Sequence, residues 1–571
     1  MEQAMIIVAT QATNLIDAFT HIDKANKRRA GGTETRGLPA SPSLYLVFDE
    51  AHTLTDVQED TNKTHYTELR RALQALKSVG VLTVFMSTTG AISQLASSTR
   101  LDPSVRLQRN DFTLMPPWTT FGWDQLWQDC KIKSGDSITD LVRTEKVVKF
   151  GRPLYVAIAF QLFQALITLY FRWGLRFQHG DIEVKSSILS FAAVKLLARN
   201  NWQTTEFDEK LYFACLAQRI CLELNSTIYQ EREAEQDVVQ NHLRICMKVN
   251  DDRESLVTLS PSEPIVSEAA SLIMEENTKF KMVDGLKAIL RGFGLDQGDR
   301  GELVAMALLT VARDLTVKDF KLRSHDDEWL PTFTVPQFLS RLLNRKTLGS
   351  DRPSMFRTPE ENIPFEEQFR KSIMHFNHFI QPHKQDVLTA RHNHPKFIAR
   401  GAALRGAKGQ PGTDFAMFFT HSGPAVEVGN DGLILMQIKN IANMSGTPDK
   451  SLFHAMCPYK LGIYSEGEDP PGPIIRIVLS LASRGCSLTR VEYSEDECKT
   501  YGKVTTYDYF ASGLDPSVLV PVKPEEQQGW LAILQDSPWS KLYANNSALS
   551  SLRKQAPLAM NEDNHSSFFA E

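Results

Sequence analysis

The stretch Leu433-Ile434-Leu435-Met436-Gln437-Ile438-Lys439 is an apolar run that ends in a glutamine and a lysine. A short, continuous apolar run of this kind is typical of a strand that is buried on both faces. Successive side chains of a strand point to opposite faces, so Gln437 and Lys439 share one face and Ile438 lies on the other. The stretch therefore predicts a core strand that carries two polar groups to its end.

A second predicted strand lies just upstream, where Gly412-Thr413-Asp414 leads into another apolar run. If the two strands form an antiparallel hairpin centred midway between Asp414 and Lys439, these two residues lie opposite each other. In a rival hairpin, residues 425–428 pair with residues 433–436 through a Gly-Asn-Asp-Gly turn. In that case Asp414 need not face Lys439, and the sequence leaves both pairings open.

Asp414, Gln437 and Lys439 together resemble the PD-(D/E)xK nuclease core, in the variant where Gln replaces the first acidic residue of the final triplet. The Asp414 carboxylate and the Gln437 carbonyl would coordinate Mg²⁺, which prefers oxygen ligands and retains water. Lys439 would position the attacking water or help to deprotonate it. The alternative is a surface lysine at a strand end. Candidates for a further metal-binding carboxylate are Glu366, Glu367 and Glu427.

Near the N-terminus, the apolar run Leu44-Tyr45-Leu46-Val47-Phe48 leads directly into Asp49 and Glu50. Residues 66–77 place leucines at helical spacing, and residues 81–86 form another apolar run. The order of strand, helix and strand predicts a βαβ unit with parallel strands.

The polar residues at the carboxyl ends of these two strands resemble those that P-loop ATPases place there. In such a site Asp49 would help to hold the Mg²⁺ of the nucleotide, and Glu50 would orient the nucleophile. Thr88, or one of its neighbours Ser87 and Thr89, would contact the γ-phosphate. The alternatives are an Asp-Glu pair that caps the next helix, or a DEAH helicase motif. A helicase would need a second RecA-like domain with an Arg-rich motif, and the helical middle of the chain offers none.

The phosphate cradle of a P-loop ATPase is missing. The cradle requires GxxxxGK followed by Ser or Thr, because backbone N–H groups and the lysine must neutralise the phosphates. The nearest match, residues 32–37, is followed by Leu38 and Pro39 and lacks the lysine. ATP binding is therefore not expected of this chain, and a Walker A motif is expected upstream of Met1.

The segment Phe150-Gly151-Arg152-Pro153-Leu154 resembles the GxP element of signal-transduction ATPases related to AAA+ proteins. In that element the proline turn lies against the nucleotide base, and Arg152 would reach a phosphate. The alternative is an ordinary turn with a surface arginine.

Composition narrows the class of protein. The chain has 571 residues, 42% hydrophobic and 23% charged, which predicts three or four globular domains. A net charge of -5 means that any contact with nucleic acid needs a local basic patch. The seven scattered cysteines and an N-terminus without signal-peptide features predict an intracellular protein of the cytoplasm or nucleus.

Residues 155–171 are too short and too polar for a membrane span and predict a buried helix.

The motif order resembles that of large fungal proteins related to Crinkler-type effectors, over roughly residues 44–485. The matching segments are YLVFDEAH, VFMSTTG, FGRPL, SPSEP, GDRGELV, FNHFI, RGAAL and LILMQIKN. The resemblance implies an α/β multidomain protein in which an AAA+/signal-transduction-type ATPase is coupled through helices to a restriction-endonuclease-like domain. It assigns Asp49 and Glu50 to Walker B, and Asp414, Gln437 and Lys439 to the nuclease-like site.

We accordingly predict five segments: a partial P-loop ATPase module at 1–153, a helical domain at 154–345, a linker at 346–364, a nuclease-like domain at 365–540 and a disordered tail at 541–571. The leading hypothesis is an ATPase-coupled, Mg²⁺-dependent nuclease-like protein of the conflict or effector type. Its ATPase half is expected to be inactive in this chain, its substrate is nucleic acid, and its helical domain is available to other proteins. The contrasting hypothesis is a non-catalytic interaction protein that retains both folds.

Overall fold

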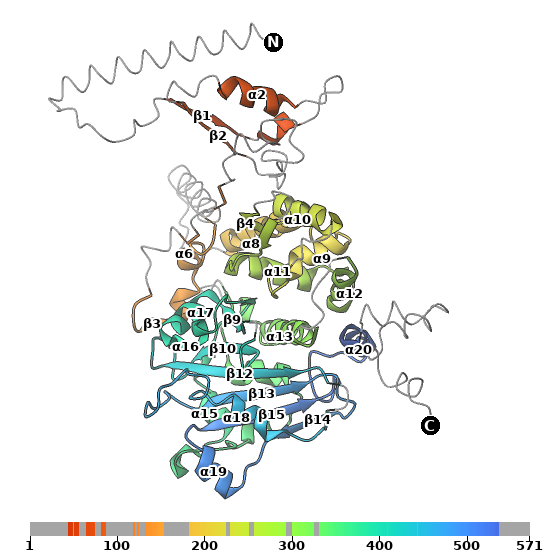
Figure 1. Ribbon diagram of the computed structural model, residues 1–571. Coiled ribbons are helices and arrows are strands. Elements are labelled where there is room, and N and C mark those ends of the chain that lie inside the picture. Colours follow the sequence, from red (N-terminus) through yellow and green to blue (C-terminus); the bar gives the residue numbers. More distant parts are fainter. Residues whose placement is uncertain are drawn as a thin grey trace, which may run out of the picture. The chain divides into compact units, whose positions relative to one another are not determined.

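The computed structural model is a mixed α/β protein with two compact units (Figure 1). Unit 1 consists of Met1–Gly122, Lys195–Ala198 and Glu223–Pro261, and unit 2 consists of Trp123–Val194, Arg199–Leu222 and Ser262–Glu571. Within them the structure describes residues 44–49, 51–55, 64–74, 81–86, 118–119, 123–124, 132–152, 182–223, 229–250, 256–292, 300–324, 330–407, 409–441 and 444–535. The predictions for Glu50, Thr88, the helix at 155–171 and the tail at 541–571 concern residues outside this set.

Unit 1 contains the predicted βαβ element. Strands β1 (Leu44–Phe48) and β2 (Val81–Phe85) are parallel, and helix α2 (His65–Gln74) lies between them in sequence. The last residues of the strands are partners, and the rings of Phe48 and Phe85 stack with centroids 5.0 Å apart. The parallel pairing predicted from the sequence is confirmed.

Unit 1 also contains an antiparallel strand pair, β4 (Ile245–Val249) and β5 (Leu256–Leu259). The sequence predicts an almost wholly helical segment here, and this prediction is wrong for these two runs. Both are short and rich in β-formers, and a polar segment separates them, which is a hairpin pattern. Arg244 holds them together, because its Nε donates to the Thr258 hydroxyl at 2.7 Å.

Unit 2 contains the long helices predicted from the middle of the sequence. Side chains cap the N-termini of two of these helices. The Asp208 side chain accepts a hydrogen bond from the Leu211 N–H, and Thr334 and Gln337 form a reciprocal capping box. The helices are α9 (Glu209–Leu216), α11 (Pro264–Glu276), α12 (Met282–Gly292), α13 (Arg300–Asp319) and α14 (Val335–Leu342).

Buried ion pairs tie these helices together. The Arg313 guanidinium donates to Glu268 at 2.6 Å, and Arg219 donates to both oxygens of Asp314. Burial alone would raise the pKa of Glu268, but Arg313 and Arg323 hold that pKa well below its usual range. The charges compensate one another, which is the condition for keeping them out of water.

A nine-stranded sheet dominates the remainder of unit 2. Its main path runs β14-β15-β13-β12-β10-β7-β6, and β9 pairs with both β10 and β8. Strand β12 is antiparallel to β10 and parallel to β13, and β13 is parallel to β15. The strands are β6 (Phe333–Thr334), β7 (Ile373–Met374), β8 (His378–Ile380), β9 (Ala402–Arg405), β10 (Phe415–Thr420), β12 (Asp431–Lys439), β13 (Ile474–Ser480), β14 (Ser487–Arg490) and β15 (Thr506–Ser512).

The sequence pattern of residues 365–380 predicts a helix, and this prediction is wrong beyond the first turn. Helix α15 (Phe365–Phe369) ends at Phe369, and the chain then forms β7 and β8. Met374 pairs with both Phe419 and Phe333, so β7 fills a place between β10 and β6. Pairing with strands distant in sequence overrides the local helical preference.

Helices cover both faces of β12. One face packs into a core with α17 (His394–Arg400) and α18 (Lys450–Ala455), which contribute Phe397 and Phe453. On the other face, α13 approaches closely at Gly301, where an added Cβ would lie 2.9 Å from the Asn440 Cβ. Helices therefore pack against both faces of β12.

The structure contains further helices and strands. They are η1 (Ala51–Thr55), β3 (Asp136–Ser137), α5 (Ile138–Leu141), α6 (Thr144–Val147), α8 (Ile182–Leu197), α10 (Tyr229–Asn241), η5 (Leu322–Ser324), η6 (Leu348–Ser350), η7 (Pro359–Glu361), α15 (Phe365–Phe369), α16 (Asp386–Thr389), η8 (Arg391–Asn393), β11 (Ala425–Val426), α19 (Glu495–Tyr501) and α20 (Gln527–Gln535). Among the described residues, no helix combines the length and the apolar character needed to cross a membrane.

Candidate functional site

The two strands that carry the nuclease-like residues are direct neighbours. Phe415 of β10 is the partner of Met436 of β12, so Asp414 enters the sheet beside Gln437. Of the two pairings that the sequence leaves open, the structure has the antiparallel pair of β10 and β12. Its register differs by two residues from the one that sets Asp414 opposite Lys439. The rival hairpin is wrong, because β11 pairs with β3 instead of β12.

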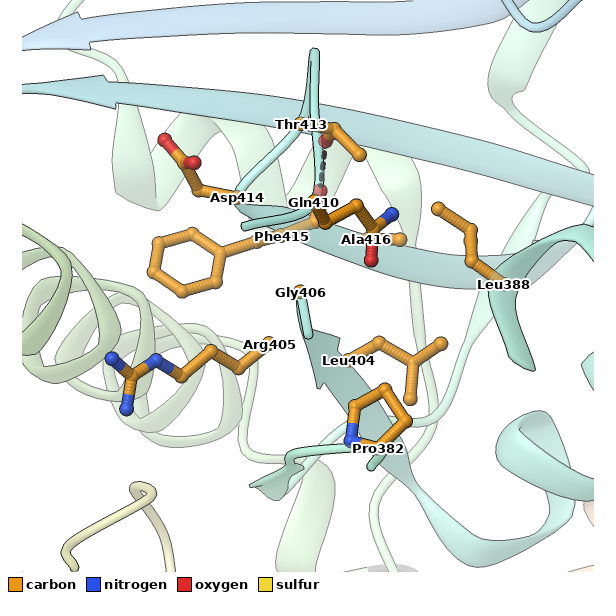
Figure 2. Close-up of a pocket in the computed structure, with 10 residues that line it drawn as sticks. All are labelled: Pro382, Leu388, Leu404, Arg405, Gly406, Gln410, Thr413, Asp414, Phe415 and Ala416. Atoms are coloured by element: carbon orange, nitrogen blue, oxygen red, sulfur yellow. Dashed lines mark hydrogen bonds between the residues drawn. The ribbon is translucent and has the colours of Figure 1, made fainter. Parts of the chain in front are cut away.

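Asp414 is fixed at this strand end by the backbone of β12. Its N–H donates to the Met436 carbonyl at 2.8 Å, and its Oδ2 accepts the Ile438 N–H at 2.6 Å. Ile438 lies between Gln437 and Lys439 in the sequence, so the carboxylate reaches the chain between the two other candidate residues. In Figure 2 the carboxylate points away from Arg405.

Gln437 offers an oxygen that the fold does not use. Its side chain is 9% exposed, and its Oε1 has no hydrogen-bond partner among the described residues. A buried polar atom left without a partner costs about 1–3 kcal/mol, so such atoms call for an explanation. A carbonyl oxygen beside a carboxylate fits the preference of Mg²⁺ for oxygen ligands.

Lys439 completes the set on the same face of β12 as Gln437. It is half-buried, and within the described part of the chain its ammonium group makes no hydrogen bond or ion pair. A cation without a carboxylate partner is available to an anionic ligand or to water.

The protein contribution to a metal shell would be small. The described residues contain no group of three or more His, Cys, Asp or Glu side chains suited to hold a metal ion. Asp414 and Gln437 would supply two oxygens, which suits Mg²⁺ because it commonly keeps several waters. The candidate third carboxylates lie elsewhere: Glu366 and Glu367 are exposed on α15, and Glu427 accepts from the Ser134 hydroxyl at 2.8 Å.

The hollow beside Asp414 is too small for a substrate. It measures about 10 Å³, and its walls include Leu388, Leu404 and Ala416 (Figure 2). That volume is about the minimum that holds a single water molecule. A nucleotide would have to bind outside it.

The sequence analysis did not identify Ser480, a polar residue next to Lys439 in the sheet. Ser480 ends β13 and is the partner of Lys439 across the parallel pair. Its side chain is fully buried, and its hydroxyl has no hydrogen-bond partner among the described residues. A serine at the end of the strand-like segment 474–480, in which Arg476 is the other polar residue, is the signal that could have revealed it.

The ATPase-like residues do not form a described site. Asp49 is exposed directly after β1, where the Met86 N–H donates to the Phe48 carbonyl at 2.8 Å. Glu50 and Thr88 lie outside the described residues. Arg152 belongs to unit 2.

The surroundings of Arg152 show a structural role. Its guanidinium lies 3.5 Å from Glu263 and stacks over the Trp123 ring at 5.3 Å. Burial raises the pKa of Glu263 to about 7, against the lowering effects of Arg152 and Arg400. The predicted phosphate contact of Arg152 therefore competes with a buried carboxylate.

The histidines of this region serve the fold. His375, His378 and His394 are buried and hydrogen-bonded, the last to Asp431 at 2.7 Å. His383 and His392 are exposed.

Residues 212–457 match the model of a family described as a domain of unknown function (DUF8736). No curated protein and no solved structure matches the chain. The matched segment includes Asp414, Gln437 and Lys439, but it ends before Ser480.

Proposed function

We propose that unit 2 is a Mg²⁺-dependent nuclease whose site is formed by Asp414, Gln437 and Lys439. The observation that carries the proposal is the unused Gln437 Oε1 at the strand end where Asp414 enters the sheet. It agrees with the resemblance to the PD-(D/E)xK core, in which two adjacent strands deliver these residue types to one edge.

The three residues divide the work of phosphodiester hydrolysis. Asp414 and Gln437 would hold the cation by their oxygens, and Mg²⁺ so bound would neutralise charge on the phosphate and acidify water. Lys439 would orient the attacking water and stabilise the negative charge that develops on the phosphate. Asp414 is already oriented, because its Oδ2 accepts the Ile438 N–H.

Cleavage assays test the proposal. Purified protein is incubated with labelled single- and double-stranded DNA and RNA, with Mg²⁺ or with EDTA. We expect Mg²⁺-dependent cleavage that falls about 100-fold or more in Lys439→Ala, because charge stabilisation in the transition state is lost. Lys499→Ala is the matched control, since Lys499 is exposed and lies within α19. Absence of cleavage, or equal rates in both variants, would contradict the proposal.

For unit 1 we propose a partial P-loop ATPase module. The support is the parallel β1 and β2 pair with Asp49 at its carboxyl end. ATP hydrolysis is expected only if a Walker A motif lies upstream of Met1. In this proposal the whole chain is an intracellular protein similar to the fungal Crinkler-type effectors, with nucleic acid as its substrate.

One observation favours the non-catalytic alternative. The Asp414 carboxylate already caps the backbone of β12, and the described residues offer no cluster of three metal-binding side chains. A protein that only binds partners would show neither cleavage nor any change in Mn²⁺ affinity between wild type and Asp414→Ala. Mn²⁺ binding can be measured by electron paramagnetic resonance.

A further inference from the structure

The row of paired residues at the carboxyl end of the sheet contains one lysine and three serines. Lys439 is the partner of Ser480, Ser480 of Ser512, and Ser512 of Ser487. Partner residues on adjacent strands point to the same face. All four side chains therefore line one face at the same height.

Two of the three serines are accounted for by the fold. The Ser512 hydroxyl donates to the Gly485 carbonyl at 2.7 Å, and the Ser487 hydroxyl donates to the Gly446 carbonyl at 2.9 Å. These bonds fasten the loops that follow β12 and β13 onto the sheet. Ser480 differs, because its buried hydroxyl has no partner in the described part of the chain.

The unused groups around Lys439 are complementary. Its ammonium group has three donors, the Ser480 hydroxyl can accept, and the Gln437 Oε1 can accept. None of the three makes a side-chain hydrogen bond among the described residues. All three lie on one face, on two adjacent strands.

We propose that Ser480 is a positioning residue for Lys439, a role that rests on the proposed nuclease function. When the site is engaged, the Lys439 ammonium donates a hydrogen bond to the Ser480 hydroxyl. This contact fixes the direction of the ammonium group. Ser480 itself, being fully buried, does not touch the substrate.

The residue type suits this role. Serine leaves room beside the lysine side chain, whereas an aliphatic residue would fill that room and accept no hydrogen bond. Ser480 is also held firmly by its backbone, because the Gly513 N–H donates to its carbonyl at 2.9 Å. The neighbouring Leu481 N–H donates to the Lys439 carbonyl at 2.9 Å, which links the two strand ends.

A double-mutant cycle tests the proposal by activity. Ser480→Ala is expected to lower kcat about tenfold without changing the Mg²⁺ dependence, and Ser480→Thr is expected to recover most of the loss. Ser480→Ala combined with Lys439→Ala should be no slower than Lys439→Ala alone, since the serine acts through the lysine. Ser512→Ala is the matched control. Additive losses in the double variant would overturn the proposal.

A second measurement does not depend on cleavage. The full chain is reductively methylated with ¹³C-formaldehyde, and the signal of Lys439 is identified by its absence in Lys439→Arg. With Mg²⁺ added, the ¹³C chemical shift of this signal should differ between the wild type and Ser480→Ala and stay unchanged in Ser512→Ala. Equal chemical shifts in all three proteins would overturn the role of Ser480 even if the protein cleaves nucleic acid. A difference in a protein without cleavage would instead contradict only the proposed nuclease.

Discussion

The strand ends of unit 1 and unit 2 carry similar sequence patterns but differ in structure. In unit 1 an apolar strand leads to Asp49, yet Tyr45 and Val47 are 59% and 57% exposed on a two-stranded sheet. In unit 2 the residues of β12 from Asp431 to Ile438 are buried between strands on both sides. The polar residues that follow an apolar run are thus held in place in unit 2, where the run is paired with strands on both sides.

The largest effect is expected from breaking a buried ion pair in unit 2. Arg313→Ala leaves Glu268 buried with less compensation and is expected to lower the free energy of unfolding by about 3–5 kcal/mol. Chemical denaturation followed by hydrogen exchange would locate the loss in the helices of unit 2. A loss below 1 kcal/mol, comparable to that in the exposed-pair control Arg143→Ala, would contradict this expectation.

Removing one carboxylate from each strand end compares the two sites directly. Asp414→Asn is expected to reduce cleavage about 100-fold, because the charge that would hold the cation is lost. Asp49→Asn should leave cleavage unchanged. Equal loss in both variants would mean that unit 1 takes part in the reaction.

Acid titration should distinguish the buried glutamate of unit 2. The pKa of Glu263 is raised to about 7 in the folded chain, chiefly by burial. The folded state therefore binds the proton more tightly than the unfolded state. Its contribution to stability is present at low pH and is lost as the pH rises through about 7.

Glu263→Gln, which stays neutral, should remove this part of the pH dependence. Denaturation midpoints measured from pH 5 to 8 would show it as a smaller decline in the variant than in the wild type. Parallel curves would show that Glu263 does not contribute.

The smallest expected effect is on stability, in variants of Ser512 and Ser480, which are partners on the adjacent strands β15 and β13. Ser512→Ala removes a hydrogen bond to the Gly485 carbonyl and should cost about 1 kcal/mol. Ser480→Ala removes a hydroxyl without a described partner and should be neutral or slightly stabilising. Thermal unfolding of the two variants gives the comparison, and a larger loss in Ser480→Ala would reveal a structural bond.

Local sequence predicted the strands well. The runs at 44–48, 81–86 and 433–439 correspond to β1, β2 and most of β12, because each alone has the composition of a buried or half-buried strand. The pairing of the Asp414 strand with the Gln437 strand was one of two alternatives that the sequence left open. Each of these strands was predicted from residues that are close together in the chain.

Contacts between distant segments caused the errors. The hairpin register could not be predicted, because Ala425 of the intervening loop pairs with Ser137, far upstream in the chain. The segment after Phe369 was predicted as helix because its pairing partners, Phe419 and Phe333, are not local. Ser480 was overlooked since its significance depends on its neighbour Lys439.

The pairing of β11 with β3 has a practical consequence for dissecting the protein. A fragment that begins at residue 212 or later would lack Asp136 and Ser137, which pair with Val426 and Ala425. It would also lose the Val142 carbonyl, which accepts the Leu330 N–H at 3.3 Å. Excision of the nuclease-like part as one uninterrupted piece would thus expose backbone groups that the whole chain keeps paired. Biochemical work on this half should begin with the entire polypeptide.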